Sequence, residues 1–302
     1  MHLPAMGSAE QVNIRDRWIN VEGLLVHYLM AGQIGTPVLL LHGGGYDSAS
    51  LSYKQSIEPI SQYHRVFAPD WPGYGESDKP KLRYSTEYYV DFLGQLMDAL
   101  GLEKASLVGI SMGGAISLGF SLHSPERVEK LVLVDSHGLG KEVPGRKISY
   151  VMVRLPLLNK LVWAILGRSR RMMKWSLQTV FHDPQAVTST LVDEVFQEAK
   201  KPGVGEAWRS WQRSEIGWSS LHTNFVDKLH TLAVPTLIVH GAEDRYVPVS
   251  WAQRAHTLIK DSELCIVPQC SHWLTREKPT EFNRAVLEYL AREQKRGAST
   301  RP

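Results

Sequence analysis

Short, continuous apolar runs alternate with segments of helical spacing through most of the chain, and this alternation restricts the fold more than any other feature. The runs include residues 37–41, 104–111 and 129–136, and between them residues 84–102 and 112–128 repeat apolar side chains at helical spacing. A continuous apolar run is typical of a strand that helices cover on both faces. The order strand, helix, strand therefore predicts an α/β fold with a mostly parallel central sheet, right-handed crossovers and flanking helices.

The alternation stops after residue 138 and resumes near residue 227. Between these points no strand rich in Val and Leu occurs. The segments with amphipathic helical spacing there are residues 157–166, 189–201 and 206–217. A gap of about 90 residues is too long for an ordinary loop and should fold as an inserted unit. We expect an α/β core of residues 11–138 and 227–302, with a helical cap of residues 139–226 inserted after the sixth strand.

Charge and hydropathy exclude several kinds of partner. The chain has 34 basic and 31 acidic side chains, a net charge of +3, which argues against a nucleic-acid partner. No stretch reaches the roughly 18–20 apolar residues that span a membrane, so a membrane partner is not expected. The first ten residues lack the basic start and the long apolar segment of a signal peptide. These features predict a cytoplasmic protein, either a monomer or a homodimer.

No pattern of metal ligands stands out in the sequence. Cys265 and Cys270 are five residues apart, a spacing of neither zinc sites nor redox CxxC motifs. We expect both cysteines to be reduced thiols, with a disulfide as the alternative. The stretches around His123, His222 and His230 also lack the spacing of metal ligands. The sequence thus predicts no metal site.

A basic segment in the insertion has two interpretations. Residues 167–175 carry four cationic side chains. As an amphipathic helix they could contact a membrane surface or an anionic substrate. A solvated helix face is the simpler interpretation, and we favour it.

Ser111 stands between a buried strand and a helix, within the sequence Gly109-Ile110-Ser111-Met112-Gly113. A sharp strand-to-helix turn holds such a serine in a strained conformation, and glycines two residues before and after it avoid clashes. The hydroxyl then stands at the carboxyl edge of the sheet, where open α/β sheets bind ligands. We expect Ser111 to be a nucleophile.

A serine nucleophile needs a base and a group that orients the base. His272 follows the last predicted strand, and Asp244 follows the strand before it. The chain order Ser111, Asp244, His272 is the one expected for this type of sheet. Asp135, at the end of another strand, is the alternative acid. Asp70, after an earlier strand, is expected to fix its loop and to take no part in the chemistry.

Acyl transfer also needs hydrogen-bond donors for an oxyanion. Three glycines follow the third predicted strand, and we expect the amides of Gly44 and Met112 to form this oxyanion hole. Gly43, Ile110 and Trp273 are the candidate substrate contacts, because they adjoin the oxyanion loop, the nucleophile and the base. The tryptophans of the insertion are expected to pack the cap onto the core.

These motifs resemble the α/β-hydrolase family over about residues 17–292. The insertion would be the family's helical cap, and residues 70–80 resemble the loop after its fourth strand. The resemblance implies a Ser-His-Asp hydrolase that needs no metal or cofactor. Within the family, the segments HGGG, SMGG, DRYVP, CSHW and EFNRAVLEYL are similar to carbon–carbon bond hydrolases that act on aromatic meta-cleavage products.

Two departures from that pattern affect the expected substrate. The chain has Ile110 where those enzymes usually carry Asn, and no clear counterpart of their carboxylate-binding cap arginine, although Arg209 or Arg213 could reach the site. Loss of charge-assisted contacts of roughly 1.5–3 kcal/mol would weaken binding of a charged dienoate.

The sequence therefore favours a serine hydrolase that cleaves carboxylic esters or lactones of an apolar or aromatic small molecule, through an acyl-enzyme on Ser111. One alternative is a carbon–carbon bond hydrolase of 2-hydroxy-6-oxo-dienoates. The other is a slow hydrolase-fold receptor or binding protein that retains the three residues.

Overall fold

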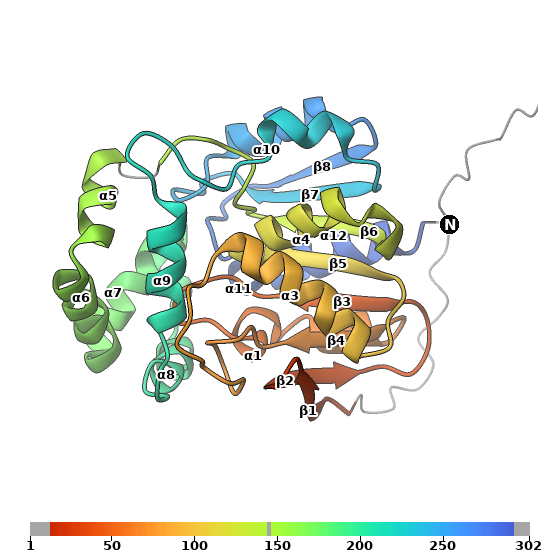
Figure 1. The fold of residues 1–302 in the computed structure, drawn as a ribbon. Helices are drawn as coiled ribbons and strands as arrows, with labels where there is room; N and C mark the ends of the chain where they lie inside the picture. The colour runs from red at the N-terminus through yellow and green to blue at the C-terminus, as the bar shows by residue number, and fades with distance from the viewer. Residues whose placement is uncertain (1–12, 144–145, 293–302) are drawn as a thin grey trace, which may run out of the picture.

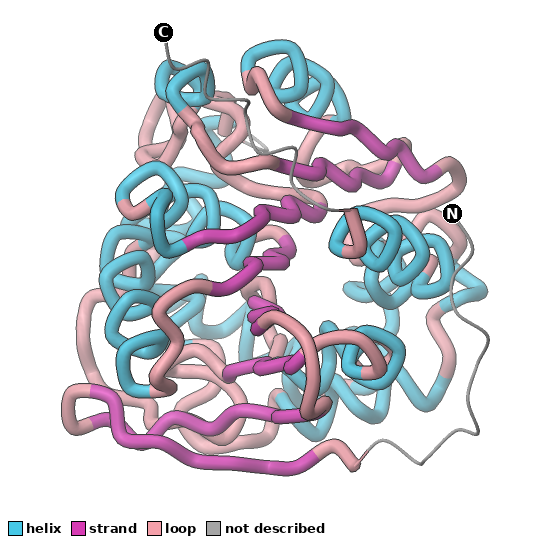
Figure 2. Tube along the Cα trace, turned by 90° about the vertical axis from the view of Figure 1, so that its right-hand side faces the viewer, coloured by secondary structure: helices cyan, strands magenta, loops and turns pink. Residues whose placement is uncertain are grey.

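An eight-stranded sheet forms the centre of the molecule (Figures 1 and 2). The computed structural model describes residues 13–143 and 146–292. The strand order is β1-β2-β4-β3-β5-β6-β7-β8. Strand β2 is antiparallel to its neighbours β1 and β4, and the pairings from β4 across to β8 are all parallel. The strands are β1 Arg15–Val21, β2 Leu24–Ala31, β3 Pro37–Leu41, β4 Arg65–Pro69, β5 Ala105–Ile110, β6 Val128–Val134, β7 Thr236–Gly241 and β8 Ser262–Val267.

Helices follow the strands in the predicted alternation. The helices before β7 are α1 Ala49–Tyr53, α2 Ile57–Ser61, α3 Thr86–Ala99, α4 Met112–His123, α5 Arg146–Arg154, α6 Pro156–Arg168, α7 Arg170–Val180, α8 Ser189–Glu198 and α9 Glu206–Glu215. Those after β7 are α10 Val249–Leu258, α11 Leu274–Glu277 and α12 Pro279–Leu290. Short 3₁₀ turns lie at Pro125–Arg127, Pro184–Ala186 and Val226–Thr231. The sheet is mostly parallel and flanked by helices, and α5 to α9 are inserted in the chain between β6 and β7. This arrangement confirms the predicted fold class.

Two apolar layers enclose the sheet, because successive strand residues point to opposite faces. Leu39 and Leu41 of β3 belong to one buried cluster with side chains of α3, α4 and α10. Val38 and Leu40 belong to the other, with side chains of α1, α2 and α12. Figure 2 shows helices on both sides of the strands. The central strands are buried on both faces, which explains their continuous apolar runs.

Helices α5 to α9 form a group at one end of the sheet (Figure 1). They are joined to the core in part by a third apolar cluster, in which Leu51 of α1 packs with side chains of α7 and α8. A second connection is Trp211 of α9, which is buried in the cluster of α3 and α4. These helices occupy the segment for which a cap was predicted. The boundaries 11–138, 139–226 and 227–302 stay a prediction.

No single helix among the described residues is long and apolar enough to cross a membrane. Only α5 and α6 taken together meet the requirement of length and composition, and they are bent by 91° where they join. Cys265 and Cys270 are both free thiols. Cys270 is fully buried, and burial raises the pKa of its thiol far above the usual range.

Glycine is required at the start of α4. A Cβ built on Gly113 would lie 2.1 Å from the carbonyl oxygen of Leu41, which belongs to the backbone of β3 and cannot move away. We predict that Gly113→Ala lowers the free energy of unfolding by at least about 2 kcal/mol, measured by urea denaturation. Gly94→Ala in α3 is the matched control, because its Cβ would meet only the ring of Phe120, at 3.3 Å. Equal losses for the two variants would contradict this account.

Candidate active site

Ser111 lies in a strained turn between β5 and α4. Its φ of +52° and ψ of −114° fall outside the regions that a non-glycine residue normally adopts. The turn is held by backbone hydrogen bonds, from Ser111 N to Val134 O at 2.9 Å and from His137 N to Ser111 O at 3.1 Å. The flanking glycines are necessary, since a Cβ on Gly109 would lie 2.3 Å from the carbonyl oxygen of Gly113. The sequence predicted this strained turn from the motif together with the buried strand before it and the helix after it.

The structure brings Ser111, His272 and Asp244 together. His272 Nε2 lies 3.0 Å from Ser111 Oγ, and His272 Nδ1 lies 2.8 Å from Asp244 Oδ2. The other carboxylate oxygen of Asp244 accepts the backbone N–H groups of Tyr246 at 2.7 Å and Val247 at 2.9 Å. Asp244 is therefore fixed by its own loop, and it orients His272 so that Nε2 faces the serine. This arrangement can deprotonate a hydroxyl and return the proton to a leaving group.

Burial and charge act in opposite directions on this group. Burial disfavours the charged form of His272, but the carboxylate of Asp244 stabilises the imidazolium more, so the pKa of His272 is raised above its usual value. Burial also disfavours the charged form of Asp244, yet its interaction with His272 holds the pKa of Asp244 below the usual range. Near neutral pH, Asp244 is a carboxylate.

Asp135, the alternative acid, lies beneath Asp244 and does not contact His272 through a hydrogen bond. Its two oxygens accept the N–H groups of Gly241 at 2.8 Å and Leu274 at 3.2 Å. Burial and the nearby negative charge of Asp244 raise the pKa of Asp135 well above its usual value. The carboxyl of Asp135 is engaged by two backbone amides, and the geometry favours Asp244 as the partner of His272.

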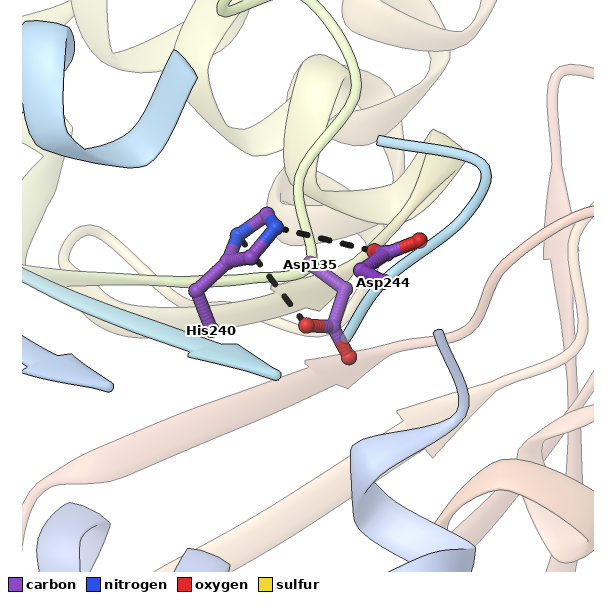
Figure 3. Close-up of side chains that lie close together, drawn as sticks. All are labelled: Asp135, His240 and Asp244. Atoms are coloured by element: carbon purple, nitrogen blue, oxygen red, sulfur yellow. Dashed lines mark ion pairs between the residues drawn. The ribbon is translucent and has the colours of Figure 1, made fainter. Parts of the chain in front are cut away.

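His240 lies between the two acids (Figure 3). Its Nε2 donates to Val247 O at 2.9 Å and lies 3.6 Å from Asp244 Oδ2. Its Nδ1 is buried without a partner, 4.0 Å from Asp135 Oδ1. Burial lowers the pKa of His240, so the ring is neutral and Nδ1 presents a lone pair to Asp135. A lone pair in this position is compatible with a protonated Asp135 carboxyl and would be repelled by a carboxylate.

The same three side chains are close enough to hold a cation, with ligand atoms within 4.8 Å of one another. The hydrogen bonds do not fit that use. Asp244 already accepts from His272 and two backbone amides, and His240 Nε2 donates to a carbonyl. The cluster fits a hydrogen-bonded support of the Ser111–His272–Asp244 group better than a metal site.

The predicted oxyanion loop lies beside the nucleophile. Gly43 N donates to Asp47 Oδ2 at 2.9 Å, so this amide is already occupied, and a Cβ on Gly43 would lie 3.4 Å from Ser111 Cβ. No hydrogen bond from the Gly44 amide occurs in the described part of the chain. Met112 is the first residue of α4, and its N–H falls outside the helical ladder. Both amides are therefore able to donate to an oxyanion, which is the role predicted for them.

Asp47 is a functional candidate that sequence reasoning missed. Its buried carboxylate accepts N–H groups from Gly43 and Ser48 and the hydroxyl of Ser52, which fixes the shape of the oxyanion loop. Burial nevertheless raises the pKa of Asp47. An acid six residues after a strand carries no distinctive signal in a single sequence.

The three predicted substrate contacts, Gly43, Ile110 and Trp273, differ in where they lie relative to Ser111. Ile110 is only 2% exposed, and its side chain packs in the apolar layer of α1, α2 and α12, away from the hydroxyl of Ser111. Trp273 donates from Nε1 to Ser52 Oγ at 3.2 Å and lies edge-on to Phe181, at the junction of core and insertion. Of the three residues predicted, only Gly43 directly adjoins the nucleophile.

Aromatic side chains from the insertion cover the oxyanion loop. Trp208 of α9 lies against Gly44, where a built Cβ would be 2.1 Å from the indole ring. Trp208 stacks on Trp211 at 4.9 Å, and the ring of His137 meets Trp211 edge-on at 5.3 Å. Trp208 Nε1 and His137 Nε2 are buried without partners. This wall therefore offers unused hydrogen-bonding groups beside Ser111, which sequence spacing did not reveal.

Arg209 and Arg213 line a groove of about 520 Å³ along α9, together with lysines and Arg83. They lie one and five positions after Trp208 on this helix, on a different face from Trp211. Arg213 has a lowered pKa because it is partly buried and close to Arg209 and Arg154. The structure does not bring either arginine into hydrogen bonding with the Ser111 group.

Comparison with known proteins agrees with this geometry. A family model described as the alpha/beta hydrolase fold matches residues 36–279. The chain is 32% identical to a 2-hydroxy-6-oxo-6-(2'-aminophenyl)hexa-2,4-dienoic acid hydrolase of Metapseudomonas resinovorans, over 95% of this chain and 97% of the relative. It is 30% identical to a 2-hydroxy-6-oxo-2,4-heptadienoate hydrolase of Pseudomonas putida, over 86% of this chain and 90% of the relative.

A solved structure shows the same architecture. A meta-cleavage product hydrolase from Pseudomonas fluorescens superimposes with a TM-score of 0.77 and 31% identity, covering 90% of this chain and 96% of that one. The family match extends over most of the chain and includes Ser111, Asp244 and His272. The chain therefore belongs to the α/β-hydrolase fold family and is a hydrolase whose relatives cleave meta-cleavage products.

Proposed function

We propose that this enzyme hydrolyses the carbon–carbon bond beside the ketone of a 2-hydroxy-6-oxo-dienoate, the product of meta-cleavage of an aromatic ring. The observation that carries the proposal is the similarity, at 30–32% identity over most of both chains, to hydrolases named for such dienoates. The hydrogen-bonded order Asp244, His272, Ser111 supports it, because this chemistry needs an activated nucleophile.

The preference for ester or lactone substrates was wrong. The relatives reported above, which cover most of the chain, are named as hydrolases of 2-hydroxy-6-oxo-dienoates or of a meta-cleavage product. That preference depended on the missing counterpart of the cap arginine and on Ile110. Its side chain packs into the core on the far side of the strand, so its identity says little about the polarity of the site.

The substrate is a carboxylate with several oxygens, and the site has groups that suit it. Trp208 Nε1 is a donor, and the neutral imidazole of His137 can donate or accept, since burial lowers its pKa. A buried polar group without a partner costs about 1–3 kcal/mol, which a hydrogen bond to substrate would recover. These neutral groups offer an alternative to the arginine that the chain lacks.

In the proposed reaction the substrate first tautomerises: the 2-hydroxyl loses a proton and becomes the 2-oxo group, and C5, beside the ketone, gains a proton and becomes saturated. His272 then removes the proton of Ser111 as Oγ attacks the ketone carbon. The amides of Gly44 and Met112 stabilise the oxyanion. The bond between the ketone carbon and the dienoate then breaks, and its electrons delocalise over the conjugated 2-oxo acid system, which takes a proton from His272. Water, activated by the same histidine, releases the acyl group from Ser111 as a carboxylic acid.

The bond type can be tested directly with a synthetic 2-hydroxy-6-oxo-dienoate. We expect its visible absorbance to decay with enzyme, with kcat/KM above that for p-nitrophenyl esters. Ser111→Ala should lower kcat for carbon–carbon cleavage by about 10³-fold or more, because the nucleophile is lost. Faster turnover of esters than of the dienoate would refute the proposed reaction.

The two buried acids are expected to differ in their effect on catalysis. Asp244→Asn should lower kcat by about 10³–10⁴-fold, since His272 would lose the carboxylate that fixes its tautomer. Asp135→Asn should lower kcat by less than about tenfold, because Asp135 makes no hydrogen bond to His272 and its oxygens accept only from the backbone amides of Gly241 and Leu274. Steady-state kinetics at pH 7 and circular dichroism of each folded variant provide the measurement. A reversed order would make Asp135 the acid of the triad.

The pH profile gives a separate check on His272. Its raised pKa means that kcat/KM should fall as the pH decreases through the pKa of the free enzyme, when the imidazolium forms. Removing the negative charge in Asp244→Asn should lower this pKa and move the acidic limb to lower pH. The residual activity of the variant, followed across the acidic range, should show that displacement. An unchanged limb would mean that another group controls it.

A further inference from the structure

The outward faces of α5, α6 and α7 expose more large apolar side chains than any other region. Eight such residues are between 40% and 84% exposed. They make up half of the large apolar side chains that are exposed among the described residues. These eight residues, the α5–α7 surface, are Ile148, Val151, Leu155, Leu157, Leu158, Leu161, Ile165 and Trp175. Figure 1 shows α5 and α6 on the side of the molecule away from the sheet, with α9 between them and the core. Such a patch marks an interaction site.

The spacing of these residues forms one apolar stripe on each helix. Ile148, Val151 and Leu155 are separated by three and four residues, and Leu157, Leu161 and Ile165 by four. At about 1.5 Å per residue, α5 and α6 measure about 14 Å and 20 Å, and the bend between them is 91°. Neither crosses a hydrocarbon core of about 30 Å, so both are suited to lie along a surface.

The same segment is strongly basic. Residues 143–182 contain eight Lys or Arg and no Asp or Glu. Arg170 pairs with Asp193 of α8 at 2.6 Å. Among the described side chains, six exposed cations of the segment have no ion pair, namely Lys147, Arg154, Lys160, Arg168, Arg171 and Lys174. A positive field thus surrounds the apolar stripes without local counter-charges.

The positive charge of this segment indicates which kind of partner the α5–α7 surface binds. A second copy of the chain would bring eight cations against eight, with no acidic side chain in the segment to offset them. A bilayer of anionic lipid satisfies both features, because aliphatic side chains enter the acyl boundary while Lys and Arg meet the phosphates. We propose that the α5–α7 surface docks this enzyme onto an anionic lipid bilayer.

Docking through this surface would leave the Ser111 group on the inner side of α9. Trp208 of that helix lies against Gly44 of the oxyanion loop and Trp211 is buried in the core cluster, while Figure 1 shows α9 between α5, α6 and the core. The membrane would therefore hold the enzyme without occupying its site. Hydrolysis in solution does not depend on the contact, so the docking proposal and the proposed reaction stand separately.

Co-sedimentation with vesicles tests the proposal. We expect the full chain to bind vesicles of phosphatidylcholine and phosphatidylglycerol at least about tenfold more tightly than phosphatidylcholine alone, and less tightly as salt is raised. Leu157→Glu with Leu161→Glu should reduce binding at least tenfold. Ile34→Glu, at a residue 66% exposed between β2 and β3, is the apolar control and should bind as the parent does.

A second pair of variants separates charge from apolar contact. Arg171→Glu with Lys174→Glu should also reduce binding at least tenfold, whereas Arg17→Glu with Lys260→Glu, equal in charge but elsewhere on the surface, should reduce it far less. Thermal unfolding confirms that each variant folds. Failure of the parent to bind anionic vesicles would overturn the proposal. A homodimer in gel filtration that Leu157→Glu with Leu161→Glu dissociates, without vesicle binding, would overturn it in favour of self-association.

Discussion

The contact between the start of α4 and the end of β3 is the constraint on which the site depends. Gly113 approaches the carbonyls of Leu41 and His42 so closely that a single methyl group would not fit. This approach places the free amide of Met112 next to the loop that carries Gly44, and it forces Ser111 into its positive φ. Nucleophile and oxyanion donors thus share one rigid junction, which reduces the reorganisation needed when charge develops.

The buried ionisable side chains of Asp244, Asp135 and His240 support that junction. One carboxylate, Asp244, is kept ionised by His272 and two amides, while burial and the charge of Asp244 raise the pKa of Asp135, whose carboxyl lies within 4.8 Å. Two adjacent buried carboxylates cannot both be charged at low cost, so the hydrogen bonds decide which one is. The neutral ring of His240 lies against both, with Nε2 3.6 Å from Asp244 Oδ2 and Nδ1 4.0 Å from Asp135 Oδ1.

Sequence reasoning predicted the parts of this molecule that follow from local pattern. The sheet, the helical insertion after β6 and the alignment of Ser111, Asp244 and His272 all follow from apolar runs and from residues placed just after strands. The substrate side could not be predicted in this way. Ile110 and Ser111 are neighbours in sequence, but they face opposite sides of the sheet, and Trp208 reaches Gly44 from a helix over 160 residues away.

The insertion therefore has an inner face that covers the site and an outer face exposed to solvent, and helical spacing is the same on both. Its helical spacing marks the apolar positions, but it does not distinguish those that cover the site from those that remain outside. Trp211 is 4% exposed, whereas Leu157 is 84% exposed, although both belong to amphipathic helices of the same segment. Burying the inner aromatic side chains shapes the cleft for a polar substrate. Leaving the outer aliphatic ones in water is unfavourable, and with cations around them this cost is lowest against an anionic bilayer.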